Sequence, residues 1–132
     1  MTYRAMQVTA PGVLELVERP VPQPAAGEVL IAVEACGVCG ADVGDIARAD
    51  PAAKRVPGHE VVGRIAALGA GTPSFWRVGQ RVGVGRLGGH CLECVPCRRG
   101  LFQLCQNQRF VGASCDGGYA EMMLARSTGL VS

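Results

Sequence analysis

The sequence predicts a mainly β protein, a strand-rich barrel or sandwich built from short elements. Nineteen glycines and eight prolines occur among its 132 residues, which indicates many turns. The apolar residues gather in short runs rich in β-branched side chains, and no stretch has the periodicity of a long amphipathic helix. Together these observations favour short strands joined by turns over a helical bundle.

The first half of the sequence contains two predicted strands and one short predicted helix. Val13–Glu18 alternates in part between apolar and polar residues, and Pro20 then begins a proline-rich break. Val29–Val33 is an apolar run of the kind found in strands. Asp42–Arg48 has the length of one or two helical turns, so a short helix is expected there.

The second half contains three further predicted strands. Glu60–Leu68 has the length and β-branched content of a strand, Arg81–Val84 is a shorter one, and Tyr119–Ala125 is the last. No internal repeat, low-complexity segment or linker separates these elements. Residues 1–132 are therefore predicted to form one domain.

Composition excludes several classes of protein. With 48% hydrophobic and 18% charged residues, the chain has enough apolar side chains for a core and is not of the disordered class. A net charge of +2 is too small to indicate a nucleic-acid or membrane partner. No apolar run approaches the roughly 20 residues of a membrane span, and no signal peptide precedes the domain, so we expect a cytoplasmic protein.

Four of the seven cysteines lie in the stretch HCLECVPCRRGLFQLC, with the spacing C-x2-C-x2-C-x7-C. They are Cys91, Cys94, Cys97 and Cys105. In a reducing cytoplasm such a group is typical of a metal site, and four thiolates fill the tetrahedral shell of one Zn²⁺. A complete shell leaves no position for substrate, which indicates a structural zinc. Iron–sulfur proteins share similar spacings and disulfides are a further alternative, so the count alone does not fix the metal.

A second group of candidate ligands consists of Cys39 in EACGVCGAD and His59 with Glu60 in VPGHEVVG. A thiolate and an imidazole next to glycines at strand ends can supply two ligands of an open zinc site, with Glu60 as a third or transient ligand. A His-Glu pair is also common on protein surfaces, so these residues alone leave both interpretations open.

The order of these segments resembles a known family. GVCGAD, VPGHEVVGRI, VGQRVGVG, the four-cysteine loop and DGGYAEMMLA follow one another as in the N-terminal, GroES-like catalytic domain of zinc-dependent alcohol dehydrogenases of the medium-chain family. The resemblance runs from about Met6 to Leu130. It implies a GroES-like, partly open β-barrel with short helices and a zinc-binding loop.

The resemblance also implies a role for each candidate residue. Cys39 and His59 match ligands of the catalytic zinc, and Glu60 matches a neighbouring acid that can approach the metal. Asp42 matches a carboxylate that orients a ligand imidazole by accepting its free N–H. The four cysteines at positions 91, 94, 97 and 105 match the ligands of the structural zinc.

The activity implied by the resemblance is NAD(P)-linked oxidation of small alcohols or reduction of carbonyl compounds at zinc. In this family the third catalytic ligand and the Rossmann cofactor domain lie further along the chain. We therefore expect residues 1–132 to be a truncated part of a longer, NAD(P)-dependent protein and to be inactive alone. The sequence does not determine the oligomeric state, and a homo-oligomer is compatible with it.

Three sequence features depart from the family pattern or compete with it. Gly40 and Ala41 stand where many relatives carry side chains that relay a proton, so the usual relay is in doubt. GVGRLG at Gly83–Gly88 matches G-x-G-x-x-G, but lacks the following helix and acid of a dinucleotide site, so we expect a turn there. Cys36 forms C-x-x-C with Cys39 without the βαβ context of a redox dithiol, and is expected to be a small buried group.

A second class of function stays open at this point. In it the protein is a non-catalytic interaction module, in which only the four-cysteine loop holds zinc and the barrel serves as a docking surface. Occupancy of a second metal site that depends on Cys39 and His59 distinguishes the enzyme from this module.

Overall fold

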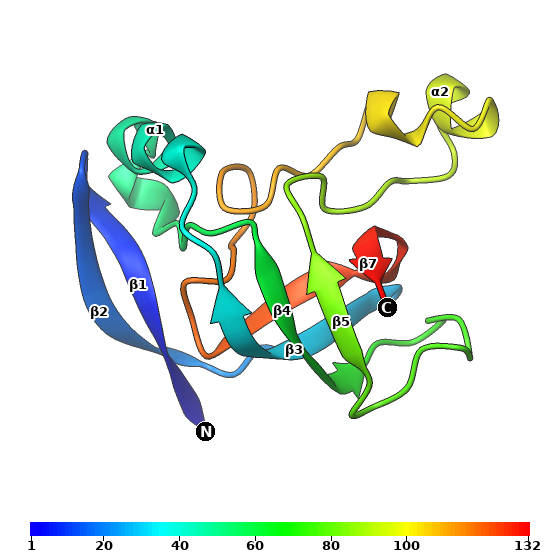
Figure 1. Cartoon of the computed structure of the whole chain (residues 1–132), viewed down its shortest axis with the longest axis horizontal. Coiled ribbons are helices and arrows are strands. Elements are labelled where there is room, and N and C mark those ends of the chain that lie inside the picture. Colours follow the sequence, from blue (N-terminus) through cyan, green and yellow to red (C-terminus); the bar gives the residue numbers. More distant parts are fainter.

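The computed structural model describes residues 1–132 and consists mainly of strands (Figure 1). The strands are β1 (Thr2–Ala10), β2 (Val13–Pro20), β3 (Glu28–Cys36), β4 (Val61–Leu68), β5 (Arg81–Val84), β6 (Met122–Arg126) and β7 (Leu130–Val131). The helices are α1 (Gly40–Arg48) and α2 (Val95–Arg98), with single 3₁₀ turns at Pro51–Ala53, Phe102–Leu104 and Ser127–Gly129. The predicted strand-rich fold is confirmed. The longest helix has nine residues, and none has the length and apolar character needed to cross a membrane.

Five strands form one antiparallel sheet in the order β6-β3-β4-β5-β7. The pairing of β3 with β4 shifts register twice, between Leu30 and Ile31 and between Val33 and Ala35. Such irregularities bend a strand and increase its twist, and the sheet curls into a half-barrel. The two ends of β3 therefore face different parts of the molecule, and its carboxyl end leads directly to Cys39 and α1 (Figure 1).

The main hydrophobic core lies against this sheet. Its ten buried residues are Val29, Ile31, Val61, Ile65, Trp76, Val82, Val84, Val111, Met123 and Ala125. In β4, buried Val61 and Ile65 alternate with exposed Val62 and Arg64, as expected for a strand with one covered face. The loop between β4 and β5 adds Trp76, which is only 8% exposed.

A separate hairpin of β1 and β2 stands beside the sheet (Figure 1). Strand β1 has no counterpart among the predicted elements. Its buried residues Tyr3, Ala5 and Val8 do not follow a strict period of two, and its register shifts between Val8 and Ala10. Because its buried residues do not alternate regularly with exposed ones, the sequence pattern does not predict this strand.

The segment before β6 connects the hairpin to the sheet. The N–H of Met6 donates to the carbonyl oxygen of Tyr119 at 2.8 Å, and the N–H of Glu121 donates to that of Arg4 at 2.9 Å. The strand predicted at Tyr119–Ala125 is therefore confirmed only from Met122 onward. The other predicted strands and the helix agree with the structure to within a few residues at each end.

Candidate metal centres

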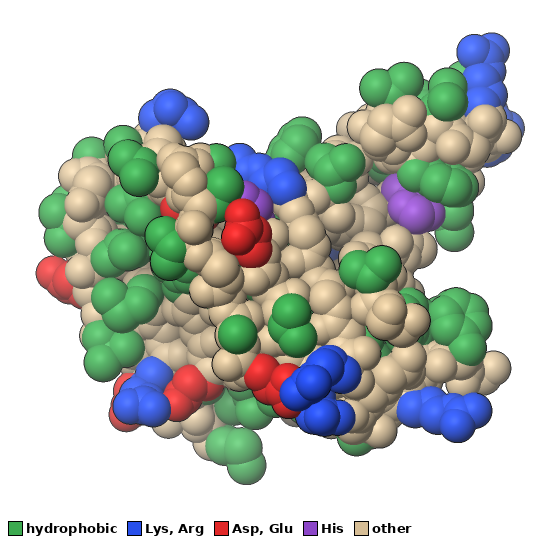
Figure 2. Space-filling view, viewed as in Figure 1, with side chains coloured by type: hydrophobic (Ala, Val, Ile, Leu, Met, Phe, Trp, Pro, Cys, Tyr) green, Lys and Arg blue, Asp and Glu red, His purple; other side chains and the backbone are tan.

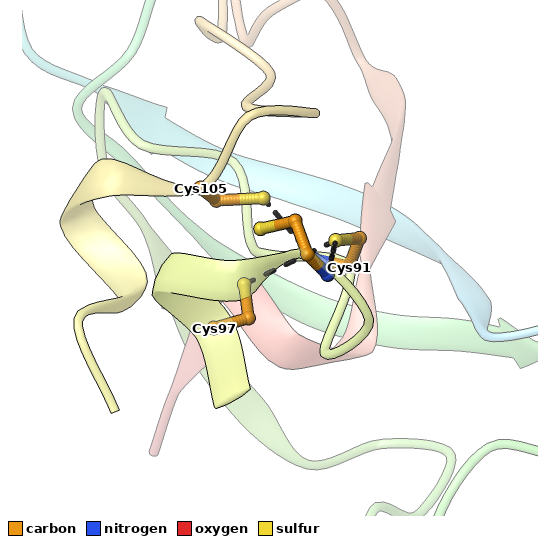
Figure 3. Close-up of side chains that lie close together, drawn as sticks. Cys91, Cys97 and Cys105 are labelled. Carbon is orange, nitrogen blue, oxygen red and sulfur yellow. Dashed lines mark hydrogen bonds between the residues drawn. The ribbon is translucent and has the colours of Figure 1, made fainter. Parts of the chain in front are cut away.

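The four cysteines of the loop lie close together, and Figure 3 shows three of them, Cys91, Cys97 and Cys105, with their side chains near one another. Their Sγ atoms all lie within 4.8 Å of one another, and those of Cys91 and Cys97 are 4.0 Å apart. Two sulfurs bound to one tetrahedral zinc at about 2.3 Å lie about 3.8 Å apart. All four are free thiols. The donor set and its spacing therefore fit one tetrahedral metal ion.

Backbone N–H groups of the loop point at these sulfur atoms. Cys91 and Asn107 donate to Cys105, Glu93 and Cys94 donate to Cys91, and Gln106 donates to Cys94, all at 3.4–3.5 Å. Hydrogen bonding, chiefly from the side chain of Asn107, lowers the pKa of the Cys91 thiol to about 5. Burial raises the pKa of the Cys97 thiol to about 12. A bound cation favours the thiolate form of all four groups.

The loop forms a lobe that projects from the body of the molecule, and hydrophobic side chains are visible on its surface (Figure 2). The exposed apolar residues in this part of the chain are Leu92, Val95, Leu101, Phe102 and Leu104. Because these apolar residues are exposed, packing alone gives the lobe little stability, and a metal ion bound by the four cysteines would add to it.

The second group of predicted ligands also comes together. Cys39 is the residue that precedes α1, and His59 and Glu60 lie in the turn that leads into β4. The Cys39 Sγ, one imidazole nitrogen of His59 and one carboxylate oxygen of Glu60 all lie within 4.8 Å of one another. His59 is 7% exposed, Cys39 is half-buried and Glu60 is exposed, so the group is covered on one side only.

Two glycines allow this close approach. Gly58 has φ +101°, and a Cβ atom there would lie 2.6 Å from Cδ1 of Tyr119 and 2.9 Å from Sγ of Cys36. A Cβ atom on Gly37 would collide with the carboxylate of Glu60. A side chain at Gly58 would displace the segment that carries the ligands, and one at Gly37 would displace the carboxylate of Glu60 from its present position.

Asp42 lies directly behind His59. This carboxylate is 2% exposed, and its Oδ2 accepts hydrogen bonds from the Cys39 N–H at 2.8 Å and the Tyr119 hydroxyl at 2.7 Å. Its Oδ1 lies 3.2 Å from Nδ1 of His59, and neither of these two atoms has another partner. This is the arrangement of a carboxylate that orients a metal-binding imidazole.

The structure adds three side chains that the sequence analysis did not assign to the site: Asp45, its ion-pair partner Arg86, and Tyr119. Asp45 follows Asp42 by three residues on α1, so both face the same side of the helix. Its carboxylate lies within 4.8 Å of the Asp42 and His59 ligand atoms and pairs with Arg86 at 3.0 Å. The third is Tyr119, whose hydroxyl reaches Asp42 across 77 residues of sequence. Only the i, i+3 spacing of the two aspartates is visible in the sequence.

The competing sequence features have different surroundings. Gly83 lies within β5, and the next helix begins only at Val95, so the strand–turn–helix arrangement of a dinucleotide site does not form at Gly83–Gly88. The half-buried Cys36 thiol donates to the carbonyl oxygen of Gly37 at 3.6 Å, and burial raises its pKa. A protonated thiol of this kind is a poor nucleophile.

This curled, strand-rich domain with a four-cysteine loop is similar to known alcohol dehydrogenases. Residues 25–132 match the family model of the alcohol dehydrogenase GroES-like domain. The chain is 47% identical over 119 residues to the alcohol dehydrogenase patD of Aspergillus clavatus, which covers 89% of this chain and 30% of that protein. The chain belongs to the alcohol dehydrogenase GroES-like domain family, and the expected GroES-like barrel is confirmed.

Solved structures agree with this assignment. The cobalt- and zinc-bound thermostable alcohol dehydrogenase from Pyrobaculum aerophilum matches with a TM-score of 0.89 and 32% identity, over 100% of this chain and 41% of that one. The acetophenone reductase from Geotrichum candidum, solved in complex with NAD, matches with a TM-score of 0.83 and 31% identity, over 99% and 40% of the two chains. The chain thus spans less than half the length of these relatives.

Proposed function

We propose that this chain is the metal-binding part of a zinc-dependent, NAD(P)-linked alcohol dehydrogenase or carbonyl reductase. The observation that carries this proposal is the convergence of Cys39, His59 and Glu60, within 4.8 Å of one another and in front of a buried aspartate. A loop held by structural zinc alone does not require this second group. Membership of the alcohol dehydrogenase family supports the assignment.

In this proposal Cys91, Cys94, Cys97 and Cys105 hold a structural zinc. The closed shell of four sulfurs excludes substrate, so the metal acts by fixing the lobe. The zinc-bound Pyrobaculum relative is consistent with such a site. A reducing compartment such as the cytoplasm keeps the thiols available for the metal.

Cys39, His59 and Glu60 would hold the catalytic zinc, with a further ligand from the rest of the longer protein. When bound, this zinc supplies Lewis-acid polarisation of an alcohol or carbonyl oxygen. Cys39 presents its sulfur at the amino end of α1, whose partial positive charge suits an anionic group. Asp42, whose Oδ1 lies 3.2 Å from Nδ1 of His59, would accept the Nδ1–H and leave Nε2 free to face the metal.

The substrates of this proposal are small alcohols or carbonyl compounds, and the nicotinamide cofactor binds to a part of the longer protein outside residues 1–132. The NAD complex of the Geotrichum reductase supports the cofactor class. Because Gly40 and Ala41 follow Cys39, no hydroxyl next to the metal ligand accepts the substrate proton. Another group or water must take that proton.

Zinc stoichiometry tests the proposal. Native mass spectrometry of the 132-residue chain should show about one tightly held zinc, rising toward two as zinc is added, since the second site has fewer protein ligands. Cys39→Ala and His59→Ala should each remove the second increment and keep the first. Cys36→Ala is the matched control, because Cys36 belongs to neither cluster, and it should keep both.

Two results would contradict the proposal. If the second increment survives Cys39→Ala and His59→Ala, these residues are not metal ligands. If only one zinc binds at any concentration and only loop variants affect it, the interaction module is the better description.

A further inference from the structure

Tyr119 joins three segments that are far apart in the sequence. Its hydroxyl donates to Oδ2 of Asp42 on α1 at 2.7 Å, and its backbone N–H donates to the carbonyl oxygen of Pro57 at 3.0 Å. Its ring lies against Gly58, so closely that a Cβ atom there would be 2.6 Å from Cδ1. Tyr119 thus contacts both the turn that carries His59 and the carboxylate behind His59.

The hydrogen bonds of Asp42 show what the hydroxyl contributes. The carboxylate is 2% exposed, so its oxygens must find partners inside the protein. Oδ2 accepts from the Cys39 N–H and the Tyr119 hydroxyl, whereas Oδ1 lies 3.2 Å from Nδ1 of His59 and has no hydrogen-bond partner elsewhere. With Oδ2 occupied by two donors, the carboxylate plane is fixed and Oδ1 is the oxygen of Asp42 that can accept from the imidazole.

We infer that Tyr119 is a positioning residue, whose hydroxyl holds Asp42 so that His59 keeps its proton on Nδ1 and presents Nε2 to the metal. This inference rests on the proposed function for the identity of the metal site, but the position of the imidazole proton is a property of the chain itself. Loss of the hydroxyl leaves Oδ2 with a single donor and frees the carboxylate to rotate away from Nδ1. The tautomer of His59 with its proton on Nδ1 is then no longer favoured over the tautomer with its proton on Nε2.

Tyr119→Phe isolates the hydroxyl, because the ring and the backbone bond to Pro57 remain. Tyr3→Phe is the matched control. Tyr3 is the only other tyrosine, is 8% exposed and lies in the small core cluster against which Tyr119 also packs, but its hydroxyl is not a hydrogen-bond partner of Asp42. A purely structural role for the Tyr119 hydroxyl would lower the melting temperature without changing the tautomer of His59.

The first measurement uses the metal-free chain. Nitrogen-15 chemical shifts of the imidazole rings at pH 8 report the tautomer, and the chain has only two histidines to assign. We expect the Nδ1–H form of His59 in the wild type and in Tyr3→Phe, and a mixture of tautomers in Tyr119→Phe. An unchanged Nδ1–H form in folded Tyr119→Phe overturns the inference, whatever the metal data show.

The second measurement is zinc affinity by competition titration. Outer partners of metal-bound histidines change affinity by about 10- to 100-fold, so Tyr119→Phe should weaken the second zinc by roughly tenfold and leave the tight zinc unchanged. Equal second-site affinity in Tyr119→Phe and wild type contradicts the positioning role. If no second zinc binds even to the wild type, the proposed function fails while the tautomer measurement still decides the role of Tyr119.

Discussion

The backbone at Gly58 decides where His59 lies. With φ at +101°, this residue adopts a conformation that side-chain-bearing residues rarely take, and it turns the chain so that the next imidazole faces Asp42. The same position lies against the Tyr119 ring. Gly58 therefore sets the direction of the chain before His59 and allows the Tyr119 ring to lie close to the backbone of this segment.

Gly58→Ala should destabilise the protein and weaken the second zinc. An alanine at positive φ costs about 1–2 kcal/mol, and the overlap with the Tyr119 ring adds about 1–3 kcal/mol of overpacking. Gly71→Ala is the matched control, since Gly71 has φ +71° with no atom within 4 Å of an added Cβ. Urea unfolding should show a clearly larger loss for Gly58→Ala. Equal losses would mean that the contact with Tyr119 is easily relieved.

Among the elements, the four-cysteine lobe depends most on a ligand. It contains only one turn of α-helix and one 3₁₀ turn, and many of its apolar side chains are exposed. A metal bound by the folded form alone adds its binding free energy to the stability of that form.

Removal of zinc should lower the melting temperature by on the order of 10 °C, since binding at 1,000 times the dissociation constant contributes about 4 kcal/mol. Hydrogen exchange should become faster in residues 88–109 and stay nearly unchanged in the β1–β2 hairpin. Thermal melts and exchange with and without a strong chelator check both expectations. An unchanged melt after metal analysis has confirmed complete removal would show that the lobe folds without zinc.

The outer face of the sheet carries a cross-strand group of charges. Glu34 of β3 accepts hydrogen bonds from Nε of Arg64 on β4 at 2.8 Å and from Nε of Arg81 on β5 at 2.9 Å. Partial burial of the carboxyl opposes ionisation, but the two guanidinium groups outweigh it, and the pKa of Glu34 lies below its ordinary value of 4.5. The ionised form is thus favoured by folding.

This lowered pKa gives the stability a definite pH dependence. The contribution of Glu34 is present above the unfolded-state pKa of about 4.5 and is lost as the pH falls through the lower folded-state value. Urea midpoints measured from pH 7 to pH 3 at low salt should fall less steeply for Glu34→Gln than for the wild type. Glu15→Gln on exposed β2 serves as the control and should keep the wild-type slope. Identical slopes for Glu34→Gln and wild type would exclude the group as a source of acid sensitivity.

The elements also show what could be predicted from the sequence. Val29–Val33 is a continuous apolar run and Glu60–Leu68 is rich in β-branched and other apolar residues, and both form central strands, β3 and β4, with small shifts at the ends. Strand β1 could not be predicted because its buried residues Tyr3, Ala5 and Val8 do not alternate regularly with exposed ones. The last strand is predicted to start at Tyr119, three residues before β6 begins. Tyr119 and Glu121 instead form backbone hydrogen bonds with β1, and local sequence patterns do not encode such a long-range contact.

For the whole molecule, the two candidate groups of metal ligands could be predicted from residue spacing and family resemblance. The residues that hold these ligands in place, such as Tyr119 and Arg86, could not. The spacing of the cysteines brings four sulfurs together within one loop, so it is visible locally. The contacts of Asp42 with Tyr119 and of Asp45 with Arg86 join residues 77 and 41 positions apart. Such contacts depend on how the sheet curls, which sequence patterns do not determine.

The arrangement of the strands argues that residues 1–132 do not bind a nicotinamide cofactor by themselves. All pairings between the named strands are antiparallel, whereas a dinucleotide site needs parallel strands with a helix beginning at the glycine turn. Gly83–Gly88 offers the glycine spacing without that helix. In the proposed enzyme, the nicotinamide cofactor would then be bound mainly by residues outside 1–132.

Calorimetric titration of the zinc-loaded chain with NADH and with NADPH should therefore show no saturable binding. Gly85→Ala tells a specific signal from a non-specific one, because an added Cβ at Gly85 meets no atom within 4 Å and leaves the fold intact. Saturable binding that Gly85→Ala abolishes would show that Gly83–Gly88 holds the pyrophosphate after all. Saturable binding that survives this substitution would place a cofactor site elsewhere on the domain and would equally contradict the prediction. Either result would mean that this part of the protein supplies more of the cofactor site than its antiparallel strands indicate.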